Sequence, residues 1–155
     1  MTKSSGSIAK KNGSNLESTI ESILKMDGYT EIDRKRFLSF SKISEQPIYS
    51  REVVVGKTIY ETNRKCDFII FHPQKFKENL IIECKWQQRV GTVDEKYPYL
   101  ILNIKKLGVD TIIVLDGKGY KKRAETWLKD QATGCLKDVV NLSEFLTIAN
   151  KGFFK

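Results

Sequence analysis

The sequence predicts a mixed α/β domain in which helices flank a central sheet. Two kinds of segment alternate along the chain. Short apolar runs rich in Val and Ile are typical of buried strands, whereas segments with an apolar residue at every third or fourth position are typical of helices. The length of 155 residues suits one such domain with a hydrophobic core. We expect residues 13–155 to form this domain and residues 1–12, which are rich in Ser, Gly and Lys, to form a flexible basic arm.

The first half of the chain predicts one helix followed by three strands. Apolar residues recur at helical spacing from Leu16 to Leu24, and Gly28 marks the expected end of this helix. Runs of Val, Ile, Leu and Phe predict strands over residues 51–59, 68–71 and 80–86. Residues 72–79 would then be the loop of a hairpin between the last two strands. Residues 29–50 show no clear pattern.

The second half of the chain predicts alternating helices and strands. Pro98 suits the first turn of a helix that runs to about Lys106 and is closed by Gly108. A strand, a helix, a short strand and a final helix follow, at residues 111–115, 121–130, 139–140 and from 142 onward. Asn141 caps the last helix, and Glu144 completes a capping box.

The charge balance points to a polyanionic partner. Lys and Arg outnumber Asp and Glu by 27 to 19, which gives a formal net charge of +8. Such a surplus favours nucleic acid, although a basic solvated surface would have the same composition. No apolar run approaches the roughly 20 residues of a membrane span, so we expect no membrane contact. The three cysteines are widely spaced, and we therefore expect no disulfide framework and a reducing, cytoplasmic location.

An acidic residue two places before a lysine occurs four times in the sequence, and one occurrence stands out by its context. Glu83 and Lys85 lie in the apolar run LIIECKW, where strand alternation puts both side chains on one face. Charged residues rarely enter such a strand without a partner or a function. Asp67 opens the preceding strand, and a hairpin would place it opposite residues 83–85. Two carboxylates and an ammonium group would then meet at one point.

This trio suits the hydrolysis of a phosphodiester. Carboxylates are the hard oxygen ligands that Mg²⁺ prefers, with Mn²⁺ as a substitute. The ion would lower the pKa of bound water and neutralise charge on the phosphate. Lys85 could orient or deprotonate the attacking water and offset charge in the transition state.

On these residues the sequence resembles the PD-(D/E)XK nucleases of the restriction-endonuclease-like fold. The motif is Asp67 followed after a spacer by Glu83-Cys84-Lys85, and the expected elements match the family's αβββαβ core, a central mixed sheet flanked by helices. The resemblance implies metal ligation by Asp67 and Glu83, with Lys85 as the catalytic lysine. Gln87 matches a glutamine that many members carry two residues beyond the lysine. Cys66 departs from the pattern, because many members have proline there.

Glu17 on the first helix is a further candidate for the metal site. Its spacing from Gly13 and Gly28 resembles the resolvase-type members of the family, in which a first-helix glutamate points at the metal. Ser14 and Glu17 also fit a capping box, in which the glutamate only satisfies the first helical amides. Glu21, one turn further on, competes for the same role.

We expect a metal-dependent DNA endonuclease, with a restriction-type enzyme first and a Holliday junction resolvase or a homing endonuclease as alternatives on the same fold. The alternative from another class is a non-catalytic DNA-binding module, and an RNA-directed enzyme comes third. Lys121, Lys122 and Arg123 open a helix, where they would either grip the phosphate backbone or form a solvated face. Cleavage of both strands by so small a domain predicts a homodimer, because each active site cuts one strand.

Overall fold

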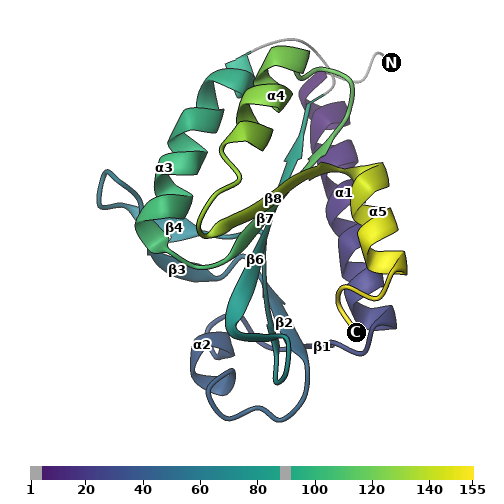
Figure 1. Ribbon diagram of the computed structural model, residues 1–155, viewed down its shortest axis with the longest axis vertical. Helices are drawn as coiled ribbons and strands as arrows, with labels where there is room; N and C mark the ends of the chain where they lie inside the picture. The colour runs from purple at the N-terminus through teal and green to yellow at the C-terminus, as the bar shows by residue number, and fades with distance from the viewer. Residues whose placement is uncertain (1–4, 88–91) are drawn as a thin grey trace.

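A mixed sheet of six strands lies at the centre of the part of the chain that the structure describes (Figure 1). The structure is a computed structural model that describes residues 5–87 and 92–155, with side chains from residue 15 onward except at 92 and 93. In spatial order the strands are β1 (Thr30–Glu31), β2 (Ile48–Arg51), β5 (Phe68–His72), β6 (Phe76–Trp86), β7 (Thr111–Asp116) and β8 (Leu136–Asn141). β2, β5 and β6 are antiparallel neighbours, whereas β1 is parallel to β2, and β6, β7 and β8 run parallel. The predicted central mixed sheet is therefore confirmed.

Helices cover both faces of this sheet (Figure 1). On one side lie α1 (Ser5–Met26) and α5 (Leu142–Asn150), and on the other lie α3 (Tyr97–Leu107) and α4 (Lys122–Asp130). A 3-10 turn, η1 (Thr92–Lys96), leads into α3, and the four-residue α2 (Phe37–Phe40) sits at one end of the molecule. The order α1, β2, β5, β6, α3, β7 is the expected αβββαβ core.

Strand alternation decides which side chains meet which helices. Leu80 and Ile82 of β6 belong to the buried cluster that contains Leu16, Ile20 and Leu24 of α1. The opposite face of the sheet packs against α3 and α4, through Ile101, Ile104, Ile113, Leu115 and Leu128. Burial of these side chains provides most of the stabilisation, at about 1.5–3 kcal/mol for each large apolar residue.

A separate two-stranded hairpin is inserted between β2 and β5. It consists of β3 (Val54–Lys57) and β4 (Asn63–Lys65), and it lies beside α3 rather than in the main sheet (Figure 1). The prediction of one strand over residues 51–59 is therefore wrong. Glu52 adopts a positive φ of 55°, which breaks the chain direction between β2 and β3.

Two further boundaries differ from the predictions. α1 begins at Ser5, so residues 5–12 of the expected arm are helical. Lysine and alanine in this segment are good helix formers, and extending an existing helix avoids the cost of nucleation. The strand β6 begins at Phe76 rather than Leu80, which shortens the hairpin loop to residues 73–75. Its first residues are mostly polar and exposed, and they lack the apolar pattern that a buried strand would show.

The signals at helix ends were accurate. Pro98 lies in the first turn of α3, and Gly108 ends that helix in the left-handed conformation at a φ of 75°. The capping box of α5 is present, because Asn141 Oδ1 accepts the Glu144 amide at 2.8 Å and Glu144 Oε1 accepts the Asn141 amide at 3.2 Å. In the described part of the chain, no helix is both long and apolar enough to cross a membrane.

Candidate active site

The strand β6 carries Glu83 and Lys85 at its carboxyl end, on the face opposite α1. Their neighbours Ile82 and Cys84 point the other way, into or against the cluster that contains α1. Glu83 is only 3% exposed and Lys85 is half-buried. Because β6 lies between β5 and β7, its backbone is hydrogen-bonded on both sides, and the two charged side chains start from a fixed base.

Asp67 immediately precedes β5 and lies opposite Glu83. The register pairs Phe68 with Ile82, which makes Asp67 and Glu83 the next pair in line. Asp67 Oδ2 accepts a hydrogen bond from the Cys84 amide at 2.7 Å, and the Asp67 carboxyl group is near enough for its charge to raise the pKa of Glu83. The hairpin thus brings the two carboxyl groups together near Lys85, as the sequence predicted when it placed Asp67 opposite residues 83–85.

The electrostatic environment of Glu83 is dominated by burial. Burial, and then the negative charge of Asp67, raise the pKa of Glu83 from 4.5 to about 7, against the opposing charges of Lys85 and Arg64. Two neighbouring carboxyl groups repel each other when both are ionised. A divalent cation beside them would neutralise that charge.

Arg64 on β4 is the partner of Glu83 that the sequence did not indicate. Its Nη2 atom lies 2.8 Å from Glu83 Oε1, and Arg64 is itself only 5% exposed. The segment Asn63-Arg64-Lys65 is polar throughout and gives no sign that one side chain turns inward. The available signal was indirect, because a buried carboxylate on β6 requires a cationic partner from elsewhere in the chain.

Glu83 and Lys85 open into a pocket of about 310 Å³ between β6, α3 and the β3–β4 hairpin. Besides Glu83, its charged lining side chains are all cationic: Arg64, Lys65, Lys85 and Lys96. Tyr97, Tyr99, Leu100, Thr58, Asn63 and Asn103 complete the wall. A basic pocket with one buried carboxylate at its base suits an anionic ligand such as a phosphate group.

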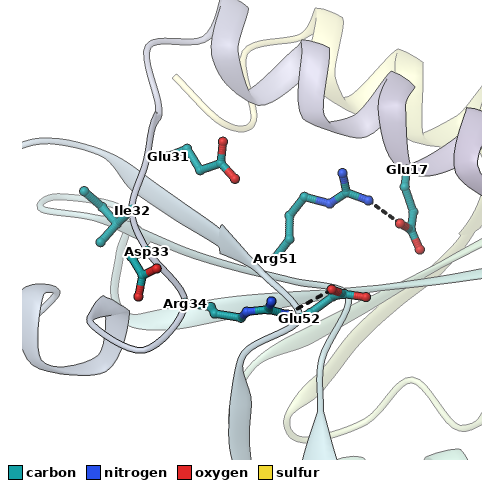
Figure 2. A pocket seen from close by; sticks show the side chains of 7 residues that line it. All are labelled: Glu17, Glu31, Ile32, Asp33, Arg34, Arg51 and Glu52. Atoms are coloured by element: carbon teal, nitrogen blue, oxygen red, sulfur yellow. Dashed lines mark hydrogen bonds and ion pairs between the residues drawn. The ribbon is translucent and has the colours of Figure 1, made fainter.

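Glu17 points into a different pocket, where it pairs with Arg51 (Figure 2). Arg51 Nη1 also lies 3.2 Å from Glu21 Oε2, so the competing candidate is held by the same guanidinium group. Burial, and then the charge of Asp67, raise the pKa of Glu17, which means that its carboxylate lies within electrostatic reach of the site. The capping-box interpretation is wrong, because α1 begins at Ser5 and Ser14 lies inside the helix.

Among the described residues, no three side chains of His, Cys, Asp or Glu converge closely enough to hold a metal ion together. Asp67 and Glu83 lie close together, but neither Glu17 nor Glu21 joins them as a third ligand. Two carboxylates with their remaining ligands supplied by water and phosphate match the way Mg²⁺ is usually held.

Gln87 stabilises the turn after β7 rather than lining the pocket. The side-chain Nε2 atom of Gln87 donates to the Gly119 backbone carbonyl at 3.1 Å, and the backbone carbonyl of Gln87 accepts the Gly119 amide at 2.7 Å. Gly117 packs so tightly here that a Cβ atom would lie 2.2 Å from the Gln87 carbonyl oxygen, and its φ is 93°. Glycine is thus required at 117, and Gln87 connects the end of β6 to that turn.

Lys121, Lys122 and Arg123 are exposed at the start of α4. α4 follows the carboxyl end of β7, which pairs in parallel with the carboxyl end of β6 through Asp116 and Trp86. The three cations consequently lie at the same edge of the sheet as the candidate site. Lys122 contacts Glu125 at 3.7 Å, and the Lys121 amide donates to Asp94 at 3.4 Å.

A comparison with known protein families matches residues 8–153 to a family described as a PD-(D/E)XK nuclease superfamily domain. The match includes every element of the αβββαβ core and all three residues of the converging site. Comparisons with curated proteins and with solved structures found no match.

Proposed function

The chain belongs to the PD-(D/E)XK nuclease superfamily, and from this premise we propose that it is a metal-dependent DNA endonuclease with Asp67, Glu83 and Lys85 as its active centre. One observation carries the proposal: Asp67 and Glu83 lie opposite each other at one end of the β5–β6 pair, and Glu83 and Lys85 line a basic pocket there. Superfamily membership implies a nuclease. The metal, the DNA substrate and the residue roles are the parts that we propose.

The carboxyl groups fit a hard divalent cation such as Mg²⁺ or Mn²⁺. The fit follows from the proximity of Asp67 and Glu83, because the negative charge of Asp67 raises the pKa of Glu83 and a cation would relieve this repulsion. When bound, a divalent cation would make a water molecule more acidic and neutralise charge on the phosphate. The Cys84 amide holds Asp67 in position, and Arg64 holds Glu83.

Lys85 faces the same pocket as Glu83 and is near enough for its charge to lower the pKa of that residue. Its ammonium group has three donors, which can orient a water molecule and offset charge on the phosphate. Lys65 and Lys96 line the outer wall and would bind the phosphates on either side. Glu17, through its proximity to Asp67, would add negative charge near the cation, and Gln87 would position the end of β6.

The formal charge of +8 supports DNA as the partner, with Lys121, Lys122 and Arg123 as secondary phosphate contacts. We propose a homodimer on DNA, because one active centre cuts one strand, and light scattering of the complex tests this. The cysteines at positions 66, 84 and 135 are free thiols, as a reducing compartment would keep them, so we propose the cytoplasm.

The test is a digest of three DNAs with Mg²⁺: linear duplex, supercoiled plasmid and a four-way junction. Discrete duplex fragments support the restriction-type or homing enzyme, and cleavage of the junction alone supports the resolvase. Lys85→Ala should slow cleavage by on the order of 10²-fold. Lys118→Ala is the matched control, since Lys118 also follows an acidic residue by two places at a strand end but is exposed. Tight binding without cleavage of any of the three DNAs would favour the binding module.

A further inference from the structure

The tip of the β3–β4 hairpin carries an aromatic side chain that is unusually open to solvent. Tyr60 is 73% exposed, whereas the other exposed aromatic side chains of the described residues, Phe40, Trp127 and Phe153, are between 37% and 39% exposed. A large exposed ring contributes little to folding, because little of its apolar surface leaves water. An exposed ring beside a candidate active site is therefore a candidate for contact with a ligand.

Tyr60 is nevertheless held in place. Its ring stacks on that of Tyr99 of α3, with centroids 5.5 Å apart and 22° between the planes. The hairpin backbone is fastened to the same helix, because the Ile59 amide donates to Asn103 Oδ1 at 2.9 Å and Lys106 Nζ donates to the Thr58 carbonyl at 2.8 Å. Tyr99 covers one face of the Tyr60 ring, and the exposure of Tyr60 leaves surface on which a further ring could stack.

This stacked pair is continuous with the basic pocket. Tyr99 and Thr58 belong to the wall of the pocket that contains Glu83 and Lys85. The cationic side chains of the pocket can bind phosphates, and the tyrosine pair at the same wall can stack on a base. The two surfaces together could therefore bind a nucleotide chain. The pocket around Glu17 is more acidic, because four carboxylates, from Glu17, Glu31, Asp33 and Glu52, line it together with only two arginines (Figure 2).

We propose that Tyr60 and Tyr99 form a stacking platform for an unpaired nucleobase of the DNA strand that enters the active centre. In the interior of an intact duplex both faces of each base are covered by neighbouring bases, so only an unpaired or unstacked nucleotide offers a free face there. The substrate class is then DNA with unpaired nucleotides next to the scissile phosphate. This inference rests on the proposed nuclease function and narrows its substrate to DNA that is not fully paired. It therefore disfavours the restriction-type enzyme, which would cut a fully paired duplex.

The test compares two DNAs of the same sequence, a fully paired duplex and a duplex that ends in a splayed single-stranded arm. Binding is measured by fluorescence anisotropy with Ca²⁺ in place of Mg²⁺ to limit cleavage. Tyr60→Ala should weaken binding of the splayed DNA by about tenfold and leave duplex binding unchanged, since stacking on an aromatic ring acts on exposed bases. Tyr60→Phe keeps the ring and should behave as wild type, and so should the control Phe40→Ala on α2.

A 2-aminopurine base in the splayed arm gives a second readout. Wild type and Tyr60→Phe should quench its fluorescence through stacking, and Tyr60→Ala should not. The inference is overturned if Tyr60→Ala binds the splayed DNA as tightly as wild type, or if it weakens both DNAs equally. The nuclease proposal survives that result provided that the wild type cuts DNA and Lys85→Ala does not. If the wild type neither binds nor cuts either DNA with Mg²⁺ or Mn²⁺, both proposals fail.

Discussion

Replacing Arg64 by methionine should reveal how strongly the fold depends on the charge of Glu83. The Arg64–Glu83 pair is 2.8 Å long, and both side chains are buried. Removing one partner of a buried pair typically costs about 3–5 kcal/mol, because the other charge is left without compensation. For a domain of this size we expect Arg64→Met to lower the Tm by on the order of 10 °C in EDTA at high pH.

The loss should depend on pH in a defined direction. Arg64 lowers the pKa of Glu83, so its removal raises that pKa further. Below the new pKa, Glu83 is neutral in the variant and the loss is small, whereas above it the buried carboxylate lacks its hydrogen-bonded guanidinium and has only the charge of Lys85 nearby. The difference in Tm between wild type and Arg64→Met should therefore be larger at pH 9 than at pH 6.

Thermal unfolding followed by circular dichroism measures both effects, with and without divalent cations. Mg²⁺ should stabilise Arg64→Met more than wild type, because a cation at Glu83 restores the missing positive charge. The matched control is Arg51→Met, which breaks the more exposed pairs of Arg51 with Glu17 and Glu21, and which should cost less than Arg64→Met because solvent screens these charges. Equal losses of Tm in Arg64→Met and Arg51→Met at pH 9 would show that burial does not strengthen the dependence of Glu83 on Arg64.

Three further outcomes follow from the site. Cleavage should require Mg²⁺ or Mn²⁺, with Ca²⁺ supporting binding but little hydrolysis, and full activity in EDTA would exclude the metal site. Glu17→Gln should keep its Tm, because glutamine can still accept a hydrogen bond from Arg51. At limiting Mg²⁺ this variant should lose cleavage, and added Mg²⁺ should partly restore it. A wild-type cleavage rate at limiting Mg²⁺ would show that Glu17 does not act on the metal. Burial holds the pKa of Glu83 above its ordinary value of 4.5, at about 7, so the folded protein binds more protons than the unfolded chain between these values. The Tm of wild type in EDTA should fall as the pH rises through that window, and the fall should be smaller in Glu83→Gln, where the raised pKa of Glu17 still contributes.

The residues that the sequence placed correctly are those that depend on one strand pair. Glu83 and Lys85 share a face because strand alternation is fixed, and a short hairpin limits where Asp67 can lie. The roles of Pro98, Gly108 and Asn141 at helix ends were also predictable, because helix-end signals depend only on residues that are near one another in the sequence.

The parts that could not be predicted depend on contacts between distant segments. Arg64 reaches Glu83 from an inserted hairpin, and nothing in its own surroundings in the sequence indicates burial. Glu17 lies in the middle of α1 and not in its first turn, so the local capping pattern of Ser14 and Glu17 was misleading. The ion pair between Glu17 and Arg51 joins two residues that neither spacing nor periodicity relates.

Electron paramagnetic resonance of Mn²⁺ measures whether Asp67 and Glu83 together hold a divalent cation. We expect Asp67→Asn and Glu83→Gln each to weaken Mn²⁺ binding by tenfold or more while both variants remain folded. The control Asp33→Asn removes a carboxylate from the other pocket and should bind Mn²⁺ as wild type does. Unchanged Mn²⁺ affinity in both Asp67→Asn and Glu83→Gln would show that these two carboxyl groups do not hold the cation.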